Sequence, residues 1–128
     1  MSTQDETLHW AHPLVKTWFL TTFNSATEPQ TQGWPAILSG QTTLISAPTG
    51  SGNTLAAFLV CINSLVVKAV NNELRDETQV LYVSPLKALG NDIQKNLLQP
   101  LAEITALAKK QGIEHIQLFL QRIAVINQ

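Results

Sequence analysis

A short glycine-containing loop between two apolar segments constrains this chain more than any other feature of its sequence. The loop, Ala47-Pro-Thr-Gly-Ser-Gly-Asn-Thr54, directly follows the β-branched, apolar segment 42–46, which is typical of a buried strand. Thr54 then begins a stretch that is apolar on nearly every face and runs to about Val70, as in a helix packed against a sheet. The sequence therefore predicts a strand–loop–helix unit of an α/β fold.

The chemistry of this loop favours a phosphate ligand. Gly50 and Gly52 allow close approach of the backbone, and successive N–H groups of the loop and of the following helix N-terminus can surround a phosphate. Thr54 is placed to bind Mg²⁺ through its hydroxyl. The lysine that normally precedes this threonine and offsets phosphate charge is replaced by Asn53, which is neutral and shorter. A plain glycine turn between two core elements is the alternative interpretation.

The remaining periodicity extends the α/β pattern. Strands that alternate with helices imply a parallel sheet with right-handed crossovers. The expected helices are 12–23, a short helix from Pro29 to a cap at Gly40, 54–70, and 86–109, which Pro100 kinks or divides and Gly112 ends. The expected strands are 42–46, 80–83 and, with an ambiguous pattern, 116–126.

Composition and charge narrow the classes of function without selecting one. The 128 residues suffice for one domain, and the formal net charge of -1 gives no overall electrostatic case for nucleic-acid binding. Only the part from Ser84 onward is mildly basic. The chain has no basic, apolar leader, and polar residues interrupt its longest apolar run, so we expect a cytoplasmic protein that does not span a membrane.

The single cysteine excludes an intrachain disulfide. Cys61 lies in an apolar run and is predicted to be a small core residue rather than a reactive thiol. His9, His12 and His115 show no metal-ligand spacing with one another or with Cys61, so a metal centre built from these side chains is not expected.

Three segments in this order resemble motifs of superfamily 2 helicases. Residues 27–34 look like the Q motif, 47–54 like motif I in its helicase form Ala-x-x-Gly-x-Gly-Lys-Thr, and 83–97 like motif Ia. The phrases Thr27-Glu-Pro-Gln30 and Tyr82-Val-Ser-Pro-Leu-Lys87 are especially similar to the large helicase-related (Lhr) family of DEAD/DEAH-type, ATP-dependent helicases. The resemblance implies an incomplete RecA-like P-loop domain over 12–110, between a frayed N-terminus, 1–11, and a divergent tail, 111–128.

The resemblance also implies roles for particular residues. Gln30 would read the adenine edge, because its amide donates and accepts together. Phe23 would support or stack on the base, although a core role is preferred for Phe23, as it is for Trp34. Serine, proline, leucine and lysine at the start of motif Ia would contact a DNA or RNA backbone without reading sequence. The expected ATP-binding residues are Gln30, Thr49, Gly50, Ser51, Gly52, Asn53 and Thr54, with Thr54 as the Mg²⁺ contact, and the expected nucleic-acid-binding residues are Ser84, Pro85, Leu86 and Lys87.

The departures from the family pattern lower the expected activity. No Asp-Glu-x-His or Asp-Glu-Ala-Asp sequence occurs, so no catalytic residue is assigned. The second RecA-like domain is also missing. We therefore expect a truncated, inactive fragment of an ATP-dependent helicase, with weak or absent binding of ATP and Mg²⁺ because of Asn53. The alternatives are an active ATPase and a non-catalytic nucleotide or nucleic-acid binding module. The sequence identifies no obligate protein partner.

Overall fold

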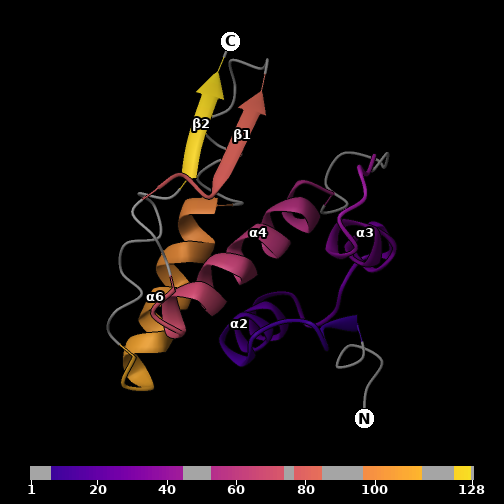
Figure 1. The fold of residues 1–128 in the computed structure, drawn as a ribbon. Helices are drawn as coiled ribbons and strands as arrows, with labels where there is room; N and C mark the ends of the chain where they lie inside the picture. The colour runs from indigo at the N-terminus through magenta and orange to yellow at the C-terminus, as the bar shows by residue number, and fades with distance from the viewer. Residues whose placement is uncertain (1–6, 45–52, 74–76, 85–96, 114–122, 128) are drawn as a thin grey trace. The chain divides into compact units, whose positions relative to one another are not determined.

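The fold was analysed in a computed structural model that describes residues 7–44, 53–73, 77–84, 97–113 and 123–127. The chain divides into two compact units, Met1–Asn63 and Ser64–Gln128, which are considered separately. The elements in these residues are α2 (Pro13–Phe23), α3 (Glu28–Leu38), α4 (Asn53–Val70), β1 (Val80–Ser84), α6 (Gln99–Lys110) and β2 (Ile123–Asn127) (Figure 1).

Local capping chemistry determines where the helices of the first unit begin and end. Pro13 opens α2 as predicted, and the His12 ring nitrogen Nδ1 accepts a hydrogen bond from the Leu14 N–H at 3.1 Å. Thr27 caps α3. Gly40, at a φ of 83°, follows the end of α3 as predicted, because its left-handed conformation turns the chain back so that the N–H of Gln41 reaches the carbonyl of Ala36 at 3.2 Å.

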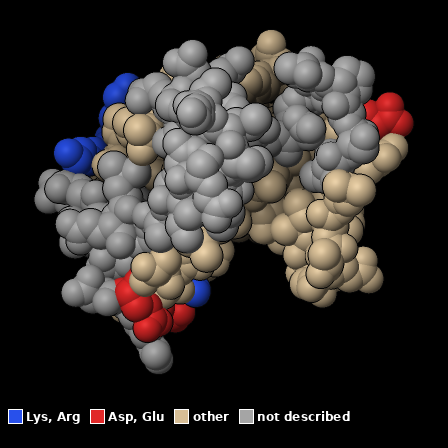
Figure 2. Space-filling view, turned by 90° about the horizontal axis from the view of Figure 1, so that it is seen from above, with Lys and Arg blue, Asp and Glu red and all other residues tan. Residues whose placement is uncertain are grey.

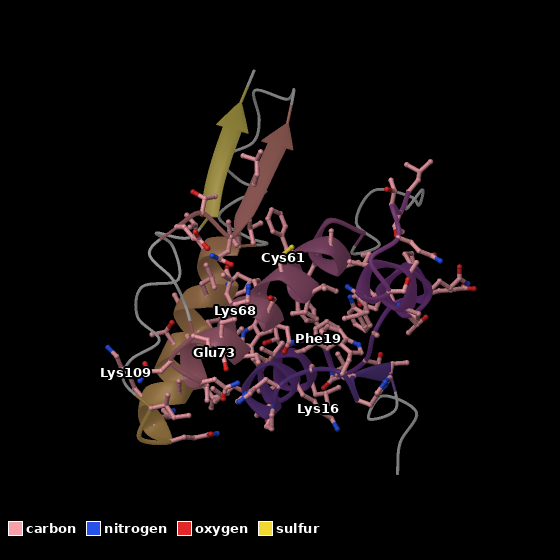
Figure 3. All side chains as sticks on the ribbon, in the orientation of Figure 1. Lys16, Phe19, Cys61, Lys68, Glu73 and Lys109 are labelled. Atoms are coloured by element: carbon pink, nitrogen blue, oxygen red, sulfur yellow. The ribbon has the colours of Figure 1, made fainter. Side chains whose placement is uncertain are left out.

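The core of the first unit combines aromatic rings from α2 and α3 with mostly aliphatic side chains from α4. Phe19, labelled in Figure 3, is fully buried, and its ring centroid lies 5.7 Å from that of Trp34 and 6.5 Å from that of Trp18. Such tilted and edge-to-face pairs add to the stabilisation from apolar burial. The buried side chains from the first part of α4 are Leu55, Ala56, Phe58, Leu59 and Ile62.

A buried amide connects α4 to the start of α2. Asn63 is 8% exposed, and its Oδ1 accepts a hydrogen bond of 2.7 Å from the backbone N–H of His12. This bond satisfies one of the N–H groups that an isolated helix N-terminus leaves without a partner. The sequence pattern predicted a helix that is apolar on nearly every face. In the structure, Ala57 and Ser64 are exposed and Cys61 is only half-buried (Figure 3), so α4 is covered on one wide face.

The cap at His12 leads to a prediction about pH. Burial lowers the pKa of His12 below the ordinary histidine value of about 6.5. The unfolded chain therefore binds the proton more tightly than the folded chain, and protonation also converts Nδ1 from acceptor to donor. We expect the first unit to lose stability as the pH falls below about 6.5 towards the lowered pKa, and to lose none of it above pH 7.

Denaturant unfolding followed by tryptophan fluorescence at several pH values measures this loss. His12→Asn should remove this component of the pH dependence, because asparagine is a good cap that does not titrate in this range. His9→Asn is the matched control and should keep it. An identical pH profile for the His12→Asn chain and the unmodified chain would show that the cap does not respond to protonation.

The second unit contains a parallel pair of strands. β1 and β2 lie side by side and point the same way (Figure 1), with Val80 paired to Ile123 and Ser84 paired to Asn127. The predicted parallel pairing is confirmed for these two strands, and β2 falls within the ambiguous segment 116–126 and one residue beyond it. The helix α6 covers the last part of the predicted helix 86–109, and Gly112, whose φ is 83°, follows its end as predicted. The first part of that predicted helix lies outside the described residues, so the kink or break at Pro100 stays a prediction.

The expectation of buried strands was wrong for the described residues. Residues 42–44 form no strand, and the side chain of Leu44 is 92% exposed. Leu81, in β1, is 59% exposed. A strand becomes buried only when neighbouring strands and helices cover it, and the residues that the structure describes pair β1 with β2 alone. The larger sheet of a RecA-like domain stays a prediction.

Candidate nucleotide-binding site

The start of α4 is the described part of the expected phosphate site. Asn53 and Thr54 are the first two residues of an 18-residue helix, which begins one residue before the predicted start at Thr54. The first N–H groups of a helix have no partner within it, and the helix dipole gives this end a partial positive charge. The backbone at this point therefore suits an anion. The side chains of Asn53 and Thr54, and the predicted loop residues Thr49, Gly50, Ser51 and Gly52, lie outside the described residues.

Gln30 is buried at the first turn of α3, where its side chain closes a capping box. It is 3% exposed, its Oε1 accepts a hydrogen bond of 2.9 Å from the Thr27 N–H, and its own N–H donates to Thr27 Oγ1 at 3.4 Å. The spacing Thr27-x-x-Gln30 is the signature of this motif, so the sequence contained a signal that the helicase interpretation did not use. The cap fixes the amide beside the start of α3. Its contact with adenine stays a prediction.

A hydrogen bond joins the helix that carries Gln30 to the helix that begins at Asn53. The Trp34 indole Nε1 donates to the carbonyl oxygen of Ala56 at 3.0 Å, and the bond is buried. The packing role predicted for Trp34 is confirmed, since the residue is 1% exposed and its ring centroid lies 5.3 Å from that of Trp10. Nothing in the sequence pattern indicated Ala56 as the acceptor, because that contact depends on how the helices pack.

Phe23 lies at the C-terminal end of α2 and is 45% exposed. Its ring packs against those of Trp18, at a centroid distance of 5.8 Å, and Phe19, at 5.1 Å. The core role predicted for Phe23 is therefore only partly right: one side of the ring contributes to the core and the rest of the ring is accessible. A role in stacking on a base stays a prediction.

The expected nucleic-acid contacts are described only at Ser84. Its backbone ends β1, and Pro85, Leu86 and Lys87 lie outside the described residues. On the face shown in Figure 2, the described lysine and arginine side chains form no continuous basic patch. Lys68 is engaged within the second unit, where its ammonium group donates to Gln79 Oε1 at 2.9 Å. On the face shown in Figure 2, the described charges therefore add no electrostatic support for a nucleic-acid surface.

Three further expectations from the sequence concern a metal centre, a reactive cysteine and a membrane-spanning helix. Within the described ranges, no group of three or more His, Cys, Asp or Glu side chains could hold a metal ion. Burial raises the pKa of the Cys61 thiol, which favours the unreactive, protonated form. None of the helices in the described ranges combines the length and the apolar composition that crossing a membrane requires.

Comparisons with known proteins agree on one family. A family model described as DEAD/DEAH box helicase matches residues 27–126. The chain is 49% identical over 100 residues to the ATP-dependent helicase Lhr-Core of Methanocaldococcus jannaschii, which covers 78% of this chain and 12% of that protein. It is 50% identical over 100 residues to a Lhr helicase/probable uracil glycosylase of Mycolicibacterium smegmatis, covering 78% of this chain and 6% of that protein.

A solved structure gives the same result for the fold. The helicase Lhr of Mycobacterium smegmatis, solved with single-stranded DNA and AMP-PNP, superimposes with a TM-score of 0.76 at 36% sequence identity. The superposition covers 94% of this chain and 17% of that protein. The chain thus corresponds to a small part of each of these relatives, and that part has the RecA-like fold of a helicase.

Proposed function

We propose a function from one premise: this chain belongs to the DEAD/DEAH box helicase family and corresponds to an N-terminal region of its Lhr-type members. On this premise, the chain is a nucleotide-binding region that binds ATP with Mg²⁺ weakly and does not hydrolyse it alone. The observation that carries the proposal is the family match over 27–126, because this range contains both Gln30 and the loop 47–54 that leads into α4.

The described backbone at the start of α4 suits the phosphates of a nucleotide, whereas the neutral residue type at position 53 does not. The first N–H groups of α4 suit phosphate oxygens, and the Thr54 hydroxyl would hold Mg²⁺. Magnesium supplies positive charge that neutralises the phosphate oxygens. Asn53 adds no charge where the family has lysine, so the phosphate groups are held only by the backbone cradle and the metal. Binding is therefore expected to be weak.

Hydrolysis is not expected from these 128 residues. ATP cleavage by such enzymes needs a carboxylate for Mg²⁺ and a residue that orients the attacking water. No Asp-Glu-x-His or Asp-Glu-Ala-Asp sequence is present to provide them. Because the chain covers 12% of the archaeal Lhr-Core relative, translocation along nucleic acid is not assigned to it.

Contact with a nucleic-acid backbone is a second part of the proposal. It rests on the single-stranded DNA present in the solved relative and on the sequence Ser84-Pro-Leu-Lys87. A hydroxyl, backbone amides and an ammonium group suit phosphate oxygens and carry no base specificity. DNA or RNA is therefore the proposed partner, bound without sequence preference.

Calorimetric titration with ATP, with and without Mg²⁺, tests the nucleotide proposal, together with an assay of phosphate release. We expect weak, Mg²⁺-dependent heat of binding and no turnover, with binding reduced further in Gln30→Ala. If both the unmodified chain and the Asn53→Lys chain bind ATP, the chain is a non-catalytic binding module. If only the Asn53→Lys chain binds ATP, the phosphate loop of the unmodified chain is damaged. Absence of binding in both would identify an inactive remnant. Turnover by the unmodified chain would contradict the proposal.

A further inference from the structure

The hydrogen bond between the Trp34 side chain and the Ala56 carbonyl links the two parts of the proposed nucleotide site, the first turn of α3 and the start of α4. Gln30, the proposed base reader, lies one helical turn before Trp34 on α3, and both side chains are buried. Four residues of α-helix span about 6 Å along the axis. Ala56 lies three residues after Asn53, which is about 4.5 Å along α4. The single bond therefore joins the turn that carries Gln30 to the turn that begins at the phosphate loop.

This bond is specific and does not follow simply from burying an indole. Trp18 belongs to the same aromatic cluster and is 6% exposed, yet its Nε1 has no hydrogen-bond partner among the described residues. Trp10, whose ring contacts that of Trp34, donates its Nε1 to the nearby carbonyl of Thr7 at 2.8 Å. Of these three tryptophans, Trp34 is the one whose indole N–H donates to a different helix.

The surroundings of Trp34 make the bond rigid. Its ring is packed edge-on against the rings of Trp10 and Phe19, with interplanar angles of 64° and 78°. Its exposed fraction is 1%, so water cannot easily compete for either the indole N–H or the Ala56 carbonyl. A rigid, desolvated hydrogen bond between two helices fixes the separation of groups mounted on them.

We propose that Trp34 is a positioning residue for the nucleotide, which sets the distance between the base-reading turn of α3 and the phosphate-binding start of α4. This inference rests on the proposed function, since it assumes that ATP occupies both turns at once. A ligand that contacts only the start of α4 does not depend on that distance. Trp34 therefore contributes to the affinity for ATP and contributes little to the affinity for an inorganic triphosphate.

The test compares the binding of ATP with that of inorganic tripolyphosphate, both with Mg²⁺, in the full chain and in the full chain carrying Asn53→Lys. Trp34→Phe removes the N–H and keeps an aromatic ring. We expect Trp34→Phe to weaken ATP binding about five- to tenfold and tripolyphosphate binding less than about twofold. Trp10→Phe is the matched control, because the N–H that it removes donates to Thr7 rather than to α4, while an aromatic ring stays beside Trp34, and it should change neither affinity.

A purely structural role for Trp34 predicts a different pattern, in which both ligands lose affinity in proportion. That outcome would overturn the inference and leave the proposed function standing, as would unchanged binding of both ligands. Absence of ATP binding in the parent chains, before any change at Trp34, would overturn the proposed function and this inference together. If Trp34→Phe does not fold, incorporation of benzothienylalanine at position 34 replaces only the N–H by sulfur in a ring of the same shape, and the same comparison applies.

Discussion

Replacing Asn53 with lysine is expected to tighten the binding of ATP with Mg²⁺ by about 10- to 100-fold, without starting hydrolysis. Asn53 is the first residue of α4, where the backbone already suits an anion. A lysine at this point can reach the β- and γ-phosphates and form charge-assisted hydrogen bonds, which are stronger than those of a neutral amide. No Asp-Glu-x-His or Asp-Glu-Ala-Asp sequence occurs in the 128 residues, and the substitution does not supply one.

Calorimetry and phosphate release measure the two halves of this prediction independently. Asn53→Gln is the matched control, since it lengthens the side chain and adds no charge, and its affinity should stay close to that of the unmodified chain. The gain from lysine should also shrink as salt is added, because it is electrostatic. Equal affinities for the Asn53→Lys and Asn53→Gln chains would show that charge at this position is not what limits binding.

The helices of this chain were predictable because their ends depend on neighbouring residues. Pro13 favours a helix start because its ring fixes the backbone angle φ. Gly112 favours a helix end because it can adopt a positive φ. Neither effect needs a partner that is distant in sequence. The prediction therefore matched α2 and the end of α6 almost residue by residue. The end of α4 at Val70 was predicted as well, but the residue that closes it was not: Asn72 has a φ of 61°, a conformation in which asparagine can replace glycine.

The strands were less predictable because their burial depends on contacts that are distant in sequence. Val80 pairs with Ile123, and no local pattern determines that pairing. Leu44 and Leu81 show apolar, β-branched surroundings in sequence and are nevertheless exposed. Hydrophobicity indicates that a segment can be buried, whereas the elements packed against it decide whether it is.

The candidate site was predictable in its residue types and not in its internal contacts. The motif resemblance identified Gln30 and the start of α4, and the comparisons support the family behind that assignment. The capping bond between Gln30 and Thr27 could have been inferred from their spacing. The bond from Trp34 to Ala56 could not, because its partners are far apart in sequence and meet only through the packing of α3 against α4.

Phe19→Ala is expected to destabilise the first unit by about 3–5 kcal/mol. Phe19 is 0% exposed, and its ring packs against Trp18, Phe23 and Trp34, so truncation leaves a cavity at the centre of the aromatic cluster. A core in a unit of fewer than about 70 residues rarely supplies more than about 3–5 kcal/mol of net stability. The substitution is therefore expected to leave the unit Met1–Asn63 largely unfolded at room temperature.

The distribution of tryptophan makes this prediction measurable for one unit alone. All three tryptophans of the chain, Trp10, Trp18 and Trp34, lie within Met1–Asn63, so their fluorescence reports the first unit, whereas far-ultraviolet circular dichroism reports both. Phe19→Ala should abolish the fluorescence transition in denaturant. Phe23→Ala, at a ring that is 45% exposed, is the matched control and should lower the free energy of unfolding by about 1 kcal/mol or less. Equal losses for the two substitutions would mean that Phe19 is not central to the packing, since only a buried ring leaves a cavity that the surrounding side chains cannot fill.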